Sequence, residues 1–221
     1  MTTAQHPEVL VFDWDGTLVD SAGDIVGAMR EASRILGLPE PPEERMRRAI
    51  GLGLAEAFRQ IFHEHSEDER RALMEQYRQH YVRLPAQVHG QAFATVPETL
   101  QILHARGHTL AVATGKSRAG LDRSLAANDF ASLFRATRCA DESASKPHPL
   151  MLEQLSLTLC VEPEQMLMVG DTTYDMDMAR SFGCRAVGVA WGVHERDELF
   201  DSGAETVLED LAELPAWLQH R

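Results

Sequence analysis

One stretch near the start of the chain decides the fold: Val9-Leu10-Val11-Phe12-Asp13-Trp14-Asp15-Gly16-Thr17-Leu18-Val19. Its first four residues are all apolar, and an unbroken apolar run is typical of a strand covered on both faces of a parallel sheet. Because side chains alternate along an extended chain, Asp13 and Asp15 are expected on the same side. Gly16 then lets the chain turn away sharply.

The same pattern, a short apolar run that ends in polar residues, recurs along the chain. The further runs are Leu110–Ala113 before Thr114, Met166–Val169 before Gly170-Asp171, Ala186–Ala190, and a strand through Cys139. Helical spacing lies between these runs, with one helix from Val96 and another whose first turn is expected to contain Pro147. Strands that alternate with helices predict an α/β fold with a Rossmann-like open parallel sheet.

One segment interrupts this alternation. Ile25, Met29, Ala32 and Leu36 step by four, three and four residues, which is the spacing of one buried helix face, and further helical patterns follow as far as Tyr81. We therefore predict two domains: an α/β core domain at residues 1–19 and 84–221, and an all-helical cap domain at 20–83. The linker back from the cap is expected at residues 83–90.

Composition excludes several classes of protein. The chain has 221 residues, with 21 basic against 34 acidic side chains and a net charge of −13, which speaks against binding to nucleic acid. It has no apolar run long enough to span a membrane, and residues 1–8 do not resemble a signal peptide. Three scattered cysteines favour a reducing compartment. We expect a cytoplasmic protein, either a monomer or a homodimer.

Polar residues with related chemistry follow several of the predicted strands. In open α/β sheets, ligands bind outside the carboxyl ends of the strands, where Asp13, Thr114 and Asp171 are expected to meet. Lys146 follows the strand through Cys139. The aspartates would repel one another without a hard divalent cation, and Mg²⁺ in turn prefers a substrate phosphate as a further ligand. Taken singly, each residue also has a plainer interpretation, since aspartates at strand ends are commonly turn or helix-cap residues.

The segment Gly115-Lys116-Ser117 resembles the end of a nucleotide-binding P-loop, but that loop needs a glycine where Leu110 stands. We therefore expect Lys116 to be a solvent-exposed residue at the start of a helix. In the cap, residues 51–53 are expected to form either a loop that closes over the substrate or an ordinary turn. Arg45, Arg47 and Arg48 are expected to be exposed rather than to bind an acidic substrate.

Four motifs together resemble the haloacid dehalogenase-like hydrolase superfamily. They are Asp13-Trp14-Asp15-Gly16-Thr17-Leu18-Val19, Thr114-Gly115, Lys146-Pro147 and Gly170-Asp171-Thr172-Thr173-Tyr174-Asp175, in the order of that superfamily. The resemblance spans residues 9–183. A helical cap inserted after the first strand is the arrangement of its phosphoglycolate-phosphatase-like branch.

The resemblance assigns a role to each of these residues. It implies that Asp13 is the nucleophile that forms an aspartyl-phosphate, and that Asp15 is the general acid and base. It implies that Mg²⁺ is bound by the carboxylates of Asp13 and Asp171 and by the backbone carbonyl of Asp15. Thr114, Gly115 and Lys146 would then bind the phosphate, and Asp175 would orient a metal-bound water or Lys146.

The implied activity is hydrolysis of a small phosphomonoester, with 2-phosphoglycolate as the leading candidate. Asp15 argues against a dehalogenase, because a halide leaving group needs no proton. A phosphosugar mutase shares both aspartates and remains an alternative, as do a pyrophosphatase and a nucleotidase. A signalling receiver domain also combines aspartates, a threonine and a lysine on an α/β sheet, but a cap would hinder a partner from reading that edge.

Overall fold

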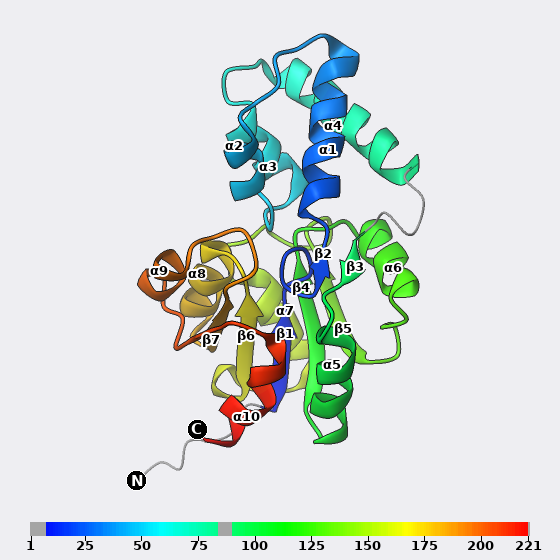
Figure 1. Ribbon diagram of the computed structural model, residues 1–221. Helices are drawn as coiled ribbons and strands as arrows, with labels where there is room; N and C mark the ends of the chain where they lie inside the picture. Colours follow the sequence, from blue (N-terminus) through cyan, green and yellow to red (C-terminus); the bar gives the residue numbers. More distant parts are fainter. Residues whose placement is uncertain (1–7, 84–89, 221) are drawn as a thin grey trace.

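The computed structural model describes residues 8–83 and 90–220 of the protein, and Figure 1 shows a sheet domain with a helical unit above one end of it. Six parallel strands form the main sheet in the order β5-β4-β1-β6-β7-β8. Their bounds are β1 Val9–Phe12, β4 Thr109–Thr114, β5 Phe134–Cys139, β6 Met166–Gly170, β7 Arg185–Val189 and β8 Val207–Leu208. The strand order reverses at β1, and the crevice at such a point is the usual ligand site of an open α/β sheet.

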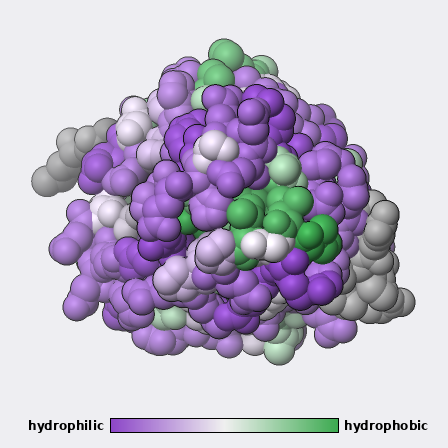
Figure 2. Space-filling model, turned by 90° about the horizontal axis from the view of Figure 1, so that it is seen from above, coloured by the Kyte–Doolittle hydropathy of each residue, from purple (hydrophilic) through white to green (hydrophobic). Residues whose placement is uncertain are grey.

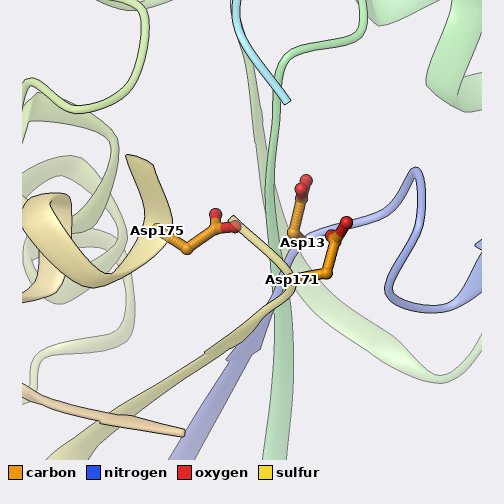
Figure 3. A group of neighbouring side chains, drawn as sticks. All are labelled: Asp13, Asp171 and Asp175. Atoms are coloured by element: carbon orange, nitrogen blue, oxygen red, sulfur yellow. The ribbon is translucent and has the colours of Figure 1, made fainter. Parts of the chain in front are cut away.

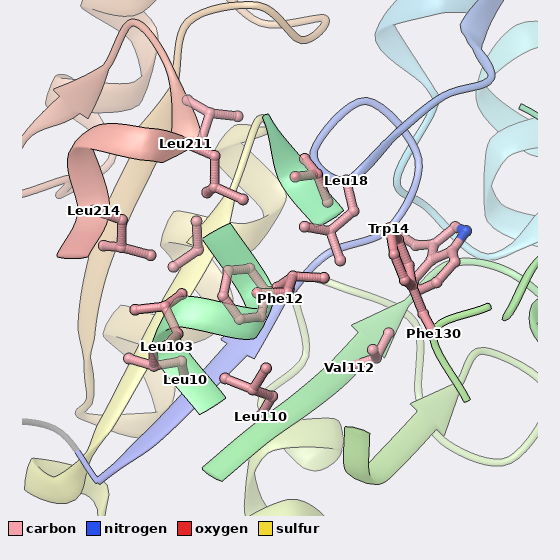
Figure 4. Packing of buried hydrophobic residues seen from close by; sticks show 14 of the residues in the cluster. Leu10, Phe12, Trp14, Leu18, Leu103, Leu110, Val112, Phe130, Leu211 and Leu214 are labelled. Carbon is pink, nitrogen blue, oxygen red and sulfur yellow. The ribbon is translucent and has the colours of Figure 1, made fainter. Parts of the chain in front are cut away.

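Helices cover both faces of the sheet because its strands are apolar on both sides. Leu10 and Phe12 point to one face, where they pack on α5 (Val96–Ala105), α6 (Arg118–Ala127) and α10 (Leu214–Gln219) (Figure 4). Val9 and Val11 point to the other face, towards α7 (Leu150–Leu159), α8 (Thr173–Phe182) and α9 (Arg196–Asp201). Two 3₁₀ turns, Pro163–Gln165 and Leu211–Glu213, complete the domain. Both faces of the sheet are thereby covered, and ligands can approach it at the ends of its strands.

Four helices between β1 and the rest of the sheet form the unit that we call the cap. They are α1 (Ala22–Leu36), α2 (Glu43–Arg48), α3 (Leu54–Ile61) and α4 (Glu67–Arg83). Ile25, Met29 and Ala32 of α1 are buried with side chains of the other three helices in a hydrophobic cluster separate from the two sheet clusters. A core of its own is a property of a domain. The division at 19/20 and 83/84 stays a prediction.

The α/β fold with a parallel sheet, predicted from the apolar runs, is confirmed. One predicted helix start is wrong: α7 begins at Leu150, with Pro149 at its N-cap, so Pro147 lies outside it. The reason is local, because a residue before proline is disfavoured in the helical region and His148 precedes Pro149. A short antiparallel pair at the base of the cap, β2 (Val19–Asp20) and β3 (Gln91–Ala92), is not among the predicted elements. The predicted linker falls largely on residues 84–89, outside the described part.

Figure 2 looks down on the cap end of the molecule and shows a mostly hydrophilic surface, with hydrophobic side chains gathered near the middle of this face. Within residues 8–83 and 90–220, none of the helices combines the length and the apolar character needed to cross a membrane. The prediction about a signal peptide concerns residues 1–8, of which the structure describes only Glu8.

Candidate active site

The strand ends bring three of the predicted site residues to one edge of the sheet. Phe12 is in register with Val112 of β4 and with Val169 of β6, and the Asp13 backbone N–H donates to the Val169 carbonyl at 2.9 Å. Asp13, Thr114 and Asp171 therefore leave three adjacent strands within one residue of the same level. All three are fully buried beneath the cap.

At the turn after β1, the side chains of Asp13 and Asp15 belong to the site, whereas the side chain of Trp14 between them does not. Trp14 points into the core, where its Nε1–H donates to Ser124 Oγ at 2.8 Å. Gly16 has φ +82°, and a Cβ atom at that position would collide with the Asp171 carboxylate. Thr17 Oγ1 donates to Asp171 Oδ1 at 2.7 Å. Glycine is thus required at position 16 both by the backbone conformation and by the close approach of Asp171.

The carboxylates of Asp13, Asp171 and Asp175 meet at the centre of the site (Figure 3), together with the ammonium group of Lys146. Lys146 Nζ lies 2.7 Å from Asp13 Oδ1 and 2.7 Å from Asp175 Oδ1, and all three side chains are buried. Asp13, Asp171 and Asp175 each place one carboxylate oxygen within 4.8 Å of the others. Because Lys146 is a single positive charge among three acidic groups, the cluster is short of positive charge.

The pKa values of the aspartates reflect that shortage. Burial raises the pKa of Asp13 well above its usual value, Lys146 counteracts this, and the neighbouring Asp175 and Asp171 add to the rise. Burial, together with Asp175, raises the pKa of Asp171 to about 7. A bound cation would favour the ionised carboxylates. Asp13 Oδ2 is buried and has no hydrogen-bond partner in the described part of the chain, which leaves it free as a ligand. These residues fit Mg²⁺, which prefers carboxylate oxygens.

Asp175 is tied to the protein through both of its oxygens. Oδ1 pairs with Lys146, while Oδ2 accepts from Thr172 Oγ1 at 2.7 Å and from the Thr172 backbone N–H at 3.1 Å. The bond from the Thr172 backbone N–H and the return bond from the Asp175 backbone N–H to Thr172 Oγ1 at 3.3 Å form a capping box at the start of α8. This arrangement suits a residue that holds Lys146 in place. The predicted contribution of the Asp15 backbone carbonyl to the metal site stays a prediction.

Asp15 lies in a different environment, and here the interpretation of Lys116 as solvent-exposed is wrong. The Lys116 ammonium lies 2.8 Å from Asp15 Oδ1, with its side chain only 7% exposed, and it also donates to the Tyr81 hydroxyl of α4 at 3.2 Å. Ser21 Oγ donates to the same Asp15 oxygen. Burial works to lower the pKa of Lys116, but Asp15 and the nearby tyrosines together raise it. The cap thus converts a residue at a helix start into a buried member of the site.

Thr114 and Gly115 lie where the cap meets the sheet. The Lys116 backbone N–H donates to Thr114 Oγ1 at 3.2 Å, which orients the hydroxyl at the end of β4. A Cβ atom on Gly115 would collide with the Leu52 carbonyl and lie 2.6 Å from the Gly51 carbonyl. The segment 51–53 is therefore packed directly on the predicted phosphate-binding residues. Of its two interpretations, this contact favours the loop over the substrate.

Further contacts hold the other side of the cap on the core. The Arg48 carbonyl, at the end of α2, accepts from Tyr174 Oη at 3.1 Å and from His194 Nε2 at 3.2 Å. The Arg48 guanidinium pairs with Glu198 at 2.5 Å, although its side chain is 45% exposed. Burial lowers the pKa of His194, so the neutral ring can accept from the Thr173 backbone N–H at 3.0 Å. Arg48 is exposed, as expected, but it also docks the cap.

Sequence reasoning missed several residues that complete the site. Thr17 lies within the first motif and received no role, although it fixes Asp171. Gly192 packs on Asp171 so closely that a Cβ atom there would collide with it. Ser21 and Tyr81 contact Asp15 and Lys116 from the cap side of the molecule. Their contacts are formed only by tertiary packing, and apart from the motif around Thr17 no sequence signal points to them.

Known proteins resemble this chain over almost its whole length. The profile of the haloacid dehalogenase-like hydrolases matches residues 10–189. A protein of Dickeya dadantii named "probable phosphatase IndB" is 38% identical over 93% of this chain and 91% of its own length. A phosphoglycolate phosphatase of Vibrio vulnificus is 31% identical over 96% of both chains. A solved haloacid dehalogenase-like hydrolase of Streptococcus pneumoniae superposes with a TM-score of 0.86 at 26% identity, covering 97% of this chain and 99% of its own.

The chain belongs to the haloacid dehalogenase-like hydrolase family. Within that family it lies in the phosphoglycolate-phosphatase-like branch, and it is an enzyme of the phosphatase class.

Proposed function

We propose that the protein is a magnesium-dependent phosphatase that hydrolyses a small phosphomonoester through an aspartyl-phosphate on Asp13. The observation that carries this proposal is the state of the Asp13 carboxylate. One of its oxygens is paired with Lys146, and the other is buried without a hydrogen-bond partner among the described residues. A carboxylate held in this way is fixed in position and still has an oxygen available for reaction.

Each step uses groups of the chain itself. A carboxylate oxygen of Asp13 forms a bond to phosphorus as the ester P–O bond breaks, and Asp15 gives its proton to the leaving oxygen. Asp15 then takes a proton from the water that attacks phosphorus, which breaks the Asp13–phosphate bond and releases inorganic phosphate. Ser21 and Lys116 hold the Asp15 carboxylate during both proton transfers.

Other groups stabilise the phosphoryl group. Lys146, Thr114 and the Gly115 backbone N–H supply a positive charge and hydrogen-bond donors for its equatorial oxygens. Mg²⁺, held by Asp13 and Asp171 and by the Asp15 carbonyl, supplies the remaining positive charge when bound. Asp175 keeps Lys146 at its place between the carboxylates.

The substrate is a small phosphorylated metabolite, and 2-phosphoglycolate is the first compound to test because related phosphatases carry it in their names. We infer a cytoplasmic enzyme from the acidic composition and scattered cysteines, acting as a monomer or homodimer without nucleic-acid or membrane partners.

The test is release of inorganic phosphate from 2-phosphoglycolate, hexose phosphates, nucleotides and pyrophosphate, with Mg²⁺ and with a chelator. We expect release that requires Mg²⁺, and loss of at least about 10³-fold in Asp13→Asn, because an amide cannot form the intermediate. The thermal melt of Asp13→Asn reports whether the variant remains folded.

Two results would contradict the proposal. Normal turnover by folded Asp13→Asn would exclude Asp13 as the nucleophile. A phosphorylated product without free phosphate would instead identify a phosphosugar mutase.

A further inference from the structure

A cavity of about 620 Å³ lies between the cap and the core. Asp15, Gly115 and Lys116 line it, so it begins where the leaving oxygen of a phosphate ester would lie. The cap is docked on both sides of the site, through Gly53 N–H to Ser145 Oγ at 2.8 Å and through Arg48 to Glu198. The cavity is therefore a feature of the docked cap and not a gap left by a displaced one.

The walls on the cap side are mostly apolar. Ile25 and Met29 of α1, Ile50 and Leu52 of the loop on Gly115, and Leu54 of α3 all line the cavity. Covering apolar walls is favourable in proportion to the apolar area that the ligand removes from water. A two-carbon acid such as glycolate has almost no apolar surface with which to cover them. Cavities of about 300–1,000 Å³ with apolar walls are typical of ligands much larger than glycolate.

The wall on the core side owes its shape to α6. Ala119, Gly120 and Arg123 lie on one face of α6, Lys116 lies just before the N-cap Ser117 of this helix, and all four line the cavity. The two small residues leave space between two cationic side chains. Lys116 and Arg123 thus offer donors for hydroxyl or carbonyl oxygens at two points of this wall.

We propose that this cavity is the leaving-group compartment and selects phosphomonoesters of ring-bearing alcohols of about nucleoside size over 2-phosphoglycolate. The proposal rests on the proposed function, since it names the substrate class of the same site. The apolar cap walls cover the faces of the ring, while Lys116 and Arg123 donate to its oxygens.

The test compares kcat/KM for uridine 5′-monophosphate with kcat/KM for 2-phosphoglycolate in the Mg²⁺-loaded enzyme. We expect the nucleotide to be preferred by at least about tenfold, the order of selectivity that apolar contacts provide. Ala119→Phe places a ring inside the cavity and should lower this preference by about tenfold or more. Ala126→Phe is the matched control, because Ala126 is exposed on the same helix two turns further on and does not line the cavity.

The outcomes separate the two proposals. If the wild-type protein releases phosphate from no ester of the whole panel, the proposed function fails, and if it hydrolyses another ester but not the nucleotide, only the compartment is assigned wrongly. If the wild-type protein prefers 2-phosphoglycolate, or if Ala119→Phe keeps the wild-type preference, the cavity is not the leaving-group compartment. The proposed phosphatase activity is not affected by either result. Should Ala119→Phe fail to fold in a thermal melt, Ala55→Phe fills the same cavity from the cap side and the same criteria apply.

Discussion

Asp13 and Asp15 are two residues apart, yet their surroundings prepare them for different tasks. Asp13 has one oxygen without a hydrogen-bond partner among residues 8–83 and 90–220, and its other oxygen is paired with Lys146, which suits attack on phosphorus. The Oδ1 atom of Asp15 accepts a hydrogen bond from Ser21 and is paired with the ammonium group of Lys116. Asp15 also borders the cavity. Placing the two carboxylates in separate environments allows one to act as nucleophile and the other to transfer protons.

The first prediction, at the scale of residues, concerns the buried Lys116–Asp15 ion pair. Lys116→Met leaves the charge of Asp15 partly uncompensated in a buried site. The free energy of unfolding should therefore be lower than that of the wild type by about 3 kcal/mol. Asp15→Asn in the same chain removes the unpaired charge and should recover at least about 1 kcal/mol of that loss. Urea denaturation of the two single variants and the double variant measures both effects.

Arg71→Met is the control, because the Arg71 side chain is 67% exposed and its ion pairs with Glu67 and Asp68 lie at the surface. It should change stability little. Purely additive effects of Lys116→Met and Asp15→Asn would show that the buried pair does not form.

The burial of Lys116 could not be predicted from the sequence, whereas the positions of Asp13 and Asp171 could. An apolar run that ends in an aspartate indicates by itself where the side chain leaves a sheet. Lys116 is enclosed by Tyr81, which lies 35 residues away in the chain, on α4 of the cap. Such a contact depends on how the cap docks, and no local pattern carries that information.

At the scale of elements, residues 51–53 of the cap close the site, because they pack on Gly115 at the end of β4. The carbonyls of Gly51 and Leu52 leave no space for a side chain at Gly115. Apolar runs predicted the central strands of the sheet, but strands of two residues such as β2, β3 and β8 are too short for a periodic signal. The start of α7 differs from the prediction because the second of two nearby prolines, Pro149, decides it.

Gly115→Ala tests this loop contact. The added methyl group should push residues 51–52 away from the core, so kcat/KM is expected to fall by at least about tenfold, because small displacements of positioning groups are costly. The measurement is steady-state phosphate release with the best substrate of the panel.

Gly27→Ala is the matched control, since Gly27 lies in α1 and, apart from the backbone of its own helix and its chain neighbours, the described residues leave a Cβ atom there free of contacts within 4 Å. It should stabilise the helix by about 1 kcal/mol and keep kcat/KM. If Gly115→Ala also retained full activity, the loop would have no part in the docked site.

At the scale of the whole molecule, the charge of the site links stability to pH and to Mg²⁺. The folded protein raises the pKa of Asp171 from 3.8 to about 7, mainly by burial. This group therefore contributes stability below about pH 4 that is lost as the pH rises through about 7. Below about pH 7, Mg²⁺ must compete with a proton for the Asp171 carboxyl group. Above that pH, the carboxylate is ionised and can bind Mg²⁺ directly.

We predict that Mg²⁺ raises the melting temperature more at about pH 8 than at about pH 5, by a difference of at least about 3 °C. In the absence of Mg²⁺, the raised pKa of Asp171 should make the protein less stable at pH 8 than at pH 5. Thermal melts with Mg²⁺ and with a chelator at both pH values measure the difference, and Asp171→Asn should abolish it. An equal gain at both pH values would place the cation away from Asp171.

The most direct test of the central claim is to trap the covalent intermediate. The Asp15→Asn variant can neither protonate a leaving alkoxide nor activate water, so the test uses p-nitrophenyl phosphate, whose leaving group departs without a proton. The phosphate should then accumulate on the protein and survive an acid quench. Mass spectrometry of the digested protein is expected to find the phosphate on the peptide that contains Asp13, and to find none when Asp13→Asn is added. Phosphate on another residue, or phosphate release without any covalent species, would contradict the account.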